Sequence, residues 1–218
     1  MYSETPPGEL VRILEQRILP TVDKPSRYLG NEVNAVIKDP ATVEVRIALA
    51  FPDLYDLGLG NLGIHILYAA VNALPWVSCE RVYAPAVDME KALRAHGLPL
   101  FTLETKSPVG DLDLLGFTLQ SELTYTNILN LLDLAGLPLR TVDRREHDPL
   151  TCAGGPAVFN PEPLAPFLDF FVIGDGEDAI LEIVALLRTM RGSSRDDKLA
   201  ALAKLEGVYV PALYPTDV

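Results

Sequence analysis

The sequence has few cysteines and little positive charge. Cys79 and Cys152 are the only cysteines among its 218 residues. Two thiols cannot supply a three-cysteine iron–sulfur site or a four-cysteine metal site, so we expect two buried side chains in a reducing cytosol. The 18 lysines and arginines are outnumbered by 30 aspartates and glutamates, which gives a net charge of −12. This charge argues against direct binding of nucleic acid.

The sequence also lacks the patterns of a catalytic set, a metal site or a membrane span. It contains no G-x-S-x-G nucleophile elbow. No two of its three histidines (His65, His96 and His147) have the spacing of metal ligands. The run from Leu57 to Cys79 has no charged residue, but glycine, asparagine and proline interrupt it. We therefore expect a buried helix, a turn and the start of a strand there, rather than a span.

What the sequence does contain is a regular alternation of apolar strands and amphipathic helices. Hydrophobic residues make up 49% of the chain and charged residues 22%, as in a folded globular protein. Strands are predicted at residues 43–51, 79–84, 100–103, 113–119, 151–153 and 170–173. Helices are predicted at residues 59–74, 88–96, 122–135, 178–190 and 197–205. This order is typical of an α/β fold with a doubly wound, mostly parallel sheet of the Rossmann-like or flavodoxin-like kind.

The same patterns predict how the chain is organised. Residues 1–40 form an N-terminal helical arm, with the helix itself at residues 9–19. Residues 41–207 form the Rossmann-like domain, and residues 208–218 begin a linker. We expect Pro52 to end the first strand, because proline cannot donate a ladder hydrogen bond. In the helix at residues 59–74, the positions expected to face the core are Leu62, Ile66, Leu67, Ala70 and Val71.

Four loops that follow predicted strands carry unusual residue types. They span residues 53–58, 117–121, 153–156 and 173–177. In parallel sheets such loops meet at one edge, where ligands bind. Gly154-Gly155 lets a ligand approach the backbone, although a tight turn is the alternative explanation. Neither that loop nor Gly174-Asp175-Gly176-Glu177 is a dinucleotide fingerprint, and the acids of the last loop favour a neutral or hydroxyl-bearing group over a phosphate.

Taken in order, these loops resemble the cobalamin-binding Rossmann-like domain at the N-terminus of B12-dependent radical SAM proteins. The Asp-x-His-x-x-Gly motif of that family is matched by Asp53, Tyr55 and Gly58, with tyrosine in the place of histidine. Its Ser-x-Leu motif is matched loosely at residues 118–121, its Gly-Gly at residues 154–155 and its Gly-Glu-Gly-Glu at residues 174–177. The segment 152–180 is the most specific part, since Gly-Gly-Pro, Pro-Glu-Pro and Gly-Asp-Gly-Glu follow at family spacing.

The resemblance implies an accessory domain, not itself catalytic, of a radical SAM enzyme. A downstream radical SAM domain would be its partner and would hold the [4Fe–4S] cluster and S-adenosylmethionine. The domain would place cobalamin, without a histidine lower ligand, or substrate near the radical site. The residues that this resemblance assigns to cofactor binding are Asp53, Tyr55, Gly58, Thr118, Leu119, Gly154, Gly155, Gly174, Gly176 and Glu177.

Two alternatives stay open. Because Tyr55 replaces the histidine, the domain is alternatively a cofactor-free scaffold for domain docking or for recognition of a macromolecular substrate. A flavodoxin-like domain that binds a nucleotide or flavin is the other alternative. The acidic turn at residues 174–177 and the lack of a G-K-[ST] phosphate loop count against it.

Overall fold

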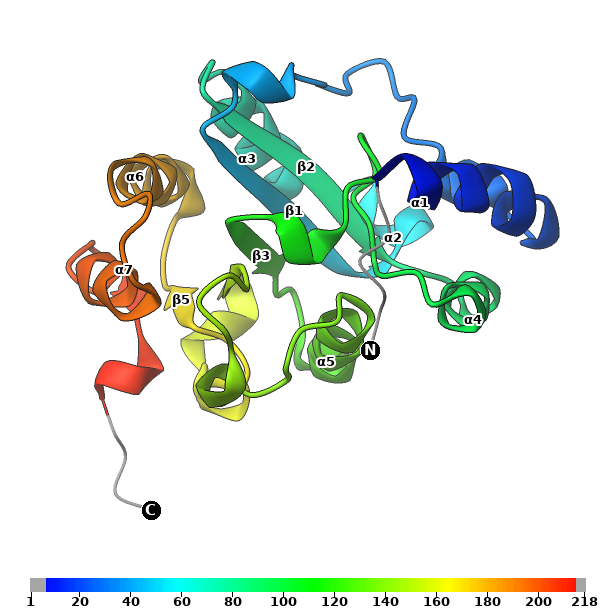
Figure 1. The fold of residues 1–218 in the computed structure, drawn as a ribbon. Coiled ribbons are helices and arrows are strands. Elements are labelled where there is room, and N and C mark those ends of the chain that lie inside the picture. Colours follow the sequence, from blue (N-terminus) through cyan, green and yellow to red (C-terminus); the bar gives the residue numbers. More distant parts are fainter. Residues whose placement is uncertain (1–6, 215–218) are drawn as a thin grey trace.

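A central β-sheet organises the chain in the computed structural model, which describes residues 7–214 (Figure 1). Within these residues the sheet has six strands in the order β2-β1-β3-β4-β5-β6, and only β6 is antiparallel to its neighbour. The strands are β1 (Val45–Leu54), β2 (Val77–Ala84), β3 (Leu114–Thr118), β4 (Leu150–Gly154), β5 (Phe170–Val172) and β6 (Val208–Tyr209). The predicted α/β fold with a doubly wound, mostly parallel sheet is confirmed.

Helices cover both faces of this sheet. The helices are α1 (Pro7–Ile13), α2 (Tyr55–Gly58), α3 (Leu62–Asn72), α4 (Val87–His96), α5 (Tyr125–Leu134), α6 (Gly176–Thr189) and α7 (Arg195–Leu202). Side chains from α3, α6 and α7 pack on one face, and α5 packs on the other together with the connections at residues 100–112 and 156–168. Figure 1 shows α1 and α4 at one end of the sheet and α6 and α7 at the opposite end.

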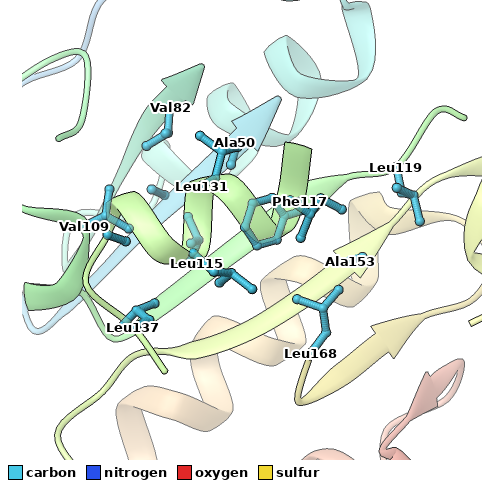
Figure 2. Close-up of a cluster of buried hydrophobic side chains, with 14 of the residues drawn as sticks. Ala50, Val82, Val109, Leu115, Phe117, Leu119, Leu131, Leu137, Ala153 and Leu168 are labelled. Carbon is cyan, nitrogen blue, oxygen red and sulfur yellow. The ribbon is translucent and has the colours of Figure 1, made fainter. Parts of the chain in front are cut away.

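Alternation along the central strands produces two cores. In β1, Val45, Ile47 and Leu49 face α3 and α6, whereas Ala48 and Ala50 face α5. Such a strand is apolar at nearly every position because both of its faces are covered. Figure 2 shows the α5 side, where the Phe117 ring from β3 lies among the side chains that α5 and the neighbouring strands contribute.

The first strand does not end at Pro52 as predicted. It continues to Leu54, with a shift in its register against β2 between Phe51 and Leu54. A bulge of this kind tolerates proline, because the ladder is already interrupted there.

The core-facing side of α3 also differs from the prediction. Ile64, Tyr68 and Val71 are buried, while Leu62 is 70% exposed and Ile66 is 40% exposed. Nearly every residue from Leu62 to Val71 is apolar, so the pattern alone did not identify the buried face.

The N-terminal arm packs against the domain. Leu10, Leu14 and Ile18 are fully buried in a cluster that includes Met89 and Leu93 of α4. After α1 the helix continues as a single π-helical segment at Leu14–Ile18 and a 3₁₀ turn at Leu19–Thr21. Residues 1–6 of the predicted arm lie outside the described residues.

Two further segments differ from the prediction. The strand expected at residues 100–103 is reduced to one bridge between Phe101 and Pro108. Residues 208–209, expected to open a linker, form β6 against β5, so the boundary predicted after residue 207 falls inside the sheet. Residues 215–218 of that segment lie outside the described residues. Within residues 7–214, no helix is long and apolar enough to cross a membrane.

Candidate functional site

The strand order places a crevice at the carboxyl edge of the sheet. The chain moves from β1 outward to β2 on one side and from β3 to β4 and β5 on the other. At such a switch point the loops after adjacent strands diverge, which leaves space for a ligand. The four loops singled out in the sequence all lie at this edge, after β1, β3, β4 and β5.

A cavity of about 220 Å³ lies beside this switch point, between α3 and α6 and above β3, β4 and β5. Its floor is apolar and consists of Leu49, Ile64, Leu67, Cys152, Val172, Ile180 and Ile183. Glycines and neutral polar groups, including Thr118 and Gln120, form much of the rest of the wall. An apolar floor with a few polar groups is the usual character of a small-molecule site.

The cavity exists because side chains on this face become smaller toward the carboxyl edge. Alternate residues of a strand point to one face, and in β3 the fully buried Leu114 is followed on that face by Gly116. In β4, Leu150 is followed by Cys152 and then Gly154. Burial raises the pKa of Cys152, which keeps it a neutral thiol. The small residues leave the space between the two helices unfilled.

Six of the ten predicted residues line this cavity, and they come from three loops. They are Thr118, Gly154, Gly155, Gly174, Gly176 and Glu177. The three loops are adjacent only because β3, β4 and β5 are neighbours in the parallel sheet.

The backbone of Leu119 holds the Gly-Gly loop in place. Its N–H donates to the Gly154 carbonyl at 2.7 Å, and its carbonyl accepts from the Ala157 N–H at 3.1 Å. Gly155 has φ +113°, and a Cβ there would lie 2.8 Å from the Leu119 oxygen. Only glycine fits this position. The Leu119 side chain is buried in the α5 core, so this residue shapes the cavity without lining it.

The fourth loop leads directly into α6. Asp175 is the N-cap residue, but its side chain makes no capping hydrogen bond, which leaves first-turn N–H groups without that partner. Glu177 and Asp178 follow in the first turn. Among the described residues that line the cavity, none is lysine, arginine or histidine.

The loop after β1 lies on the other side of the switch point and does not line the cavity. The Tyr55 hydroxyl donates to Glu32 Oε1 at 2.7 Å, and its ring meets the Tyr83 ring edge-on, with centroids 5.2 Å apart. Burial and the hydrogen bond to Glu32 raise the pKa of Tyr55 to about 12. A Cβ on Gly58 would lie 2.6 Å from Tyr83, so this glycine allows close packing. Asp53 Oδ1 accepts from the neighbouring Leu54 N–H.

Glu32 ties the arm to a buried ion-pair network. Its carboxylate bonds the Arg81 guanidinium, whose Nε donates to Glu104 Oε1 at 2.7 Å. The backbone N–H of Arg81 donates to the second Glu104 oxygen at 2.8 Å. Arg81 is 3% exposed and Glu104 is 7% exposed. The network therefore fixes Tyr55 and the arm together on the β2 side of the edge.

Comparison with known families shows to which family the chain is related. Residues 63–211 match the family described as radical SAM proteins, N-terminal. The chain belongs to this family. The match covers the segment from α3 to the end of the sheet, which includes most of the cavity wall. No curated protein and no solved structure matches the chain.

Sequence reasoning missed several parts of the site in this radical SAM N-terminal region. Gly116 was the available signal for the cavity, since glycine inside a buried strand often marks a close approach. Glu32 gave no signal, because its contact with Tyr55 joins segments 23 residues apart. Of the floor residues on α3, Leu67 was expected only to face the core, and Ile64 was not singled out.

A glycine pattern that sequence reasoning did not use runs from Gly58 to Gly63 and reads G-L-G-N-L-G. In a dinucleotide site this pattern follows a strand directly and opens the next helix. Here Gly58 instead ends α2, and Asn61 caps α3 by accepting from the Ile64 N–H at 3.0 Å. Gly58 also packs against Tyr83 rather than opening toward a ligand. The pattern therefore does not form a dinucleotide site.

No group of three or more histidine, cysteine, aspartate or glutamate side chains is placed to hold a metal ion within residues 7–214. What the cavity offers is an apolar floor, backbone amides and hydroxyl or carboxylate acceptors at its mouth. This set can bind and orient an organic ligand.

Proposed function

We propose that this region is the accessory domain of a radical SAM enzyme and that its cavity holds a ligand for the radical site of a following domain. The ligand is cobalamin without a histidine lower ligand, or the substrate of the enzyme. The observation that carries the proposal is the cavity itself, which lies at the carboxyl edge and is lined by six predicted residues. Membership of the radical SAM N-terminal family supports the role of accessory domain.

The size of the cavity limits which part of cobalamin it can accept. At about 220 Å³ it is smaller than the roughly 300–1,000 Å³ of pockets that enclose a drug-sized ligand. The corrin ring would therefore remain at the sheet edge, and only the benzimidazole end would enter between α3 and α6. Thr118, Gly154, Gly155 and Gly176 would hold that end through their backbone and the Thr118 hydroxyl. When bound, cobalamin would supply the group-transfer chemistry of its cobalt.

Tyr55, which stands where the cobalamin-binding family has its histidine, does not fit the role of a cobalt ligand. A phenolate is the ligating form of tyrosine, and the pKa of Tyr55 is raised to about 12 by burial and by Glu32. The phenol therefore keeps its proton at neutral pH and stays engaged with Glu32. We derive no role for Tyr55 at the metal.

The test is a titration of the chain with hydroxocobalamin and with reduced cobalamin, followed by absorbance and calorimetry. We expect one-to-one micromolar binding that Gly116→Val abolishes, because the added methyl groups enter the cavity. A Cβ at this position meets only ordinary contacts, the nearest at 3.4 Å from Cys152 Sγ, and a melting curve checks the fold of the variant. Tyr55→Phe is the matched control and should bind normally. Absence of binding in both redox states would refute the cobalamin proposal.

A cofactor-free scaffold is the second candidate, and two observations favour it. Tyr55 is committed to the arm through Glu32, and apolar side chains stand exposed around the carboxyl edge. These exposed residues are Leu57 (61%), Leu62 (70%), Leu123 (90%) and Phe159 (74%). Exposed apolar groups near a proposed interface suit domain docking. The test compares Leu123→Ser and Phe159→Ser in the whole enzyme and in this region alone. A scaffold predicts a lower melting temperature in the whole enzyme only.

A further inference from the structure

The turn between α3 and β2 gathers three backbone carbonyl oxygens around one ammonium group, the Nζ atom of Lys38. This ammonium donates to the carbonyl oxygens of Asn72 at 2.9 Å, Leu74 at 2.6 Å and Val77 at 2.6 Å. Asn72 is the last residue of α3 and Val77 is the first residue of β2. The turn therefore lies at the amino edge of the sheet, away from the cavity at the carboxyl edge.

Bonds that do not involve Lys38 hold this turn in place. The Asn72 side chain bonds both backbone groups of Cys79, because its Nδ2 donates to the carbonyl at 2.9 Å and its Oδ1 accepts from the N–H at 3.1 Å. The Trp76 carbonyl accepts from the Glu44 N–H at 2.7 Å. The three carbonyl oxygens should therefore keep their positions when the ammonium is removed.

The ammonium has exchanged water for these carbonyl oxygens. Lys38 is half-buried, and burial lowers the pKa of its ammonium. Carbonyl oxygens replace the hydration shell in the same way around K⁺ in a selectivity filter. The C-terminal end of a helix adds about half a negative charge, and the last turn of α3, which the structure describes in full, contains no basic side chain of its own. The turn is therefore suited to a positive charge.

Distances and ligand type decide which cation fits. Mg²⁺ takes oxygen ligands at about 2.0–2.1 Å and Ca²⁺ at about 2.3–2.6 Å, and both are usually held by carboxylates. Here the oxygens lie 2.6–2.9 Å from the positive centre, and all three belong to neutral backbone carbonyls. A larger cation with a single charge, such as K⁺ or NH₄⁺, suits this set better than a divalent ion.

We propose that the turn between α3 and β2 is a monovalent-cation site, which the side chain of Lys38 fills in place of a free ion. When substitution vacates the site, the turn binds K⁺ or NH₄⁺. In the wild type the tethered ammonium pins the segment that joins the arm to β1, so the stability of this region does not depend on K⁺. This inference is independent of what the cavity binds.

The test measures the melting temperature of Lys38→Ala at equal concentrations of tetramethylammonium, potassium and ammonium chloride. In the tetramethylammonium salt the variant should melt about 3–12 °C below the wild type, because the hydrogen bonds of a charged donor are lost. K⁺ or NH₄⁺ at about ten times its dissociation constant should recover about 3–6 °C of this loss. The wild type should melt at the same temperature in all three salts.

Lys106→Ala is the matched control. The Lys106 ammonium donates to two backbone carbonyls, those of Leu29 and Leu103. Two oxygens are too few to replace the hydration shell of an ion, so this variant should lose stability without recovery in K⁺. If Lys38→Ala does not fold, Lys38→Met serves in its place, because methionine is one atom shorter than lysine and leaves the ammonium position free.

Equal melting temperatures of the Lys38 variant in the three salts would overturn the inference. Equal recovery in Lys106→Ala would also overturn it, because the effect of K⁺ would then be general. A crystal of the Lys38 variant grown with rubidium chloride gives a direct reading. Anomalous scattering should place Rb⁺ among the three carbonyl oxygens, and its absence there would also refute the inference.

Discussion

Gly154 and Gly155 are adjacent in the chain, yet replacing each by alanine should have opposite effects on stability. At Gly155 the backbone has φ +113°, and a Cβ would lie 2.8 Å from the Leu119 carbonyl oxygen. That region of backbone space costs a non-glycine residue about 1–3 kcal/mol, and contact with a fixed backbone atom adds to this. We expect Gly155→Ala to lower the free energy of unfolding by about 2–4 kcal/mol.

Gly154→Ala is the matched control. A Cβ at this position meets nothing closer than Val172, at 3.9 Å. Alanine restricts the unfolded chain more than glycine does, so the variant should be unchanged or more stable by up to about 1 kcal/mol. The difference of roughly 3 kcal/mol between the variants corresponds to about 6–12 °C in melting temperature for a chain of this size. Urea titration and thermal melts would measure it. Equal stability of the two variants would refute the assignment of Gly155 as a position that only glycine fits.

Three further predictions concern polar groups. Arg81→Met should cost about 3–5 kcal/mol in a denaturant titration, because it strands the buried Glu104 carboxylate, and adding Glu104→Gln should recover part of that loss. Lys38→Met should lower stability by about 1.5–3 kcal/mol, because the Lys38 ammonium donates to three carbonyl oxygens around the end of α3. The pKa of Tyr55 is raised to about 12 by burial and by Glu32. The stability that the protonated Tyr55 phenol contributes is therefore complete below pH 10, the ordinary pKa of tyrosine, and is lost as the pH rises through 12. In an ultraviolet titration, the Tyr55→Phe variant should therefore lack one tyrosine ionisation that the wild type shows with a midpoint near pH 12. If the variant instead lacks an ionisation with a midpoint near pH 10, the prediction is wrong.

The sheet was predictable because its strands are short apolar runs whose order along the chain restricts the topology. β3 and β4 lie within one or two residues of the predicted ranges. β6 escaped prediction because two residues carry no periodic signal, and only pairing with β5 defines it. The prediction that Pro52 ends the first strand was wrong because a bulge depends on the register with β2, which local sequence does not encode.

The candidate site was predictable where glycine reports on the backbone and not where a contact joins distant segments. Gly155 and Gly174 both have positive φ, which explains why their loops stood out. Tyr55 was expected to contact a ligand because it occupies the histidine position of the Asp-x-His-x-x-Gly motif. Its partner Glu32 comes from the arm, and the arm's path over β2 follows from the packing of α1 on α4. No local pattern encodes that path.

These contacts divide the carboxyl edge into a closed half and an open half. On the β2 side, the Glu32 carboxylate accepts from both the Tyr55 hydroxyl and the Arg81 guanidinium. On the β3 side, Gly116 and Gly154 leave the face of the sheet uncovered between α3 and α6. A histidine at position 55 is shorter than tyrosine and would not reach Glu32 from the same backbone, so the tyrosine and the arm contact depend on each other. A ligand should therefore enter the cavity from the side of β3 to β5. The arm should remain in place whether or not the cavity is filled.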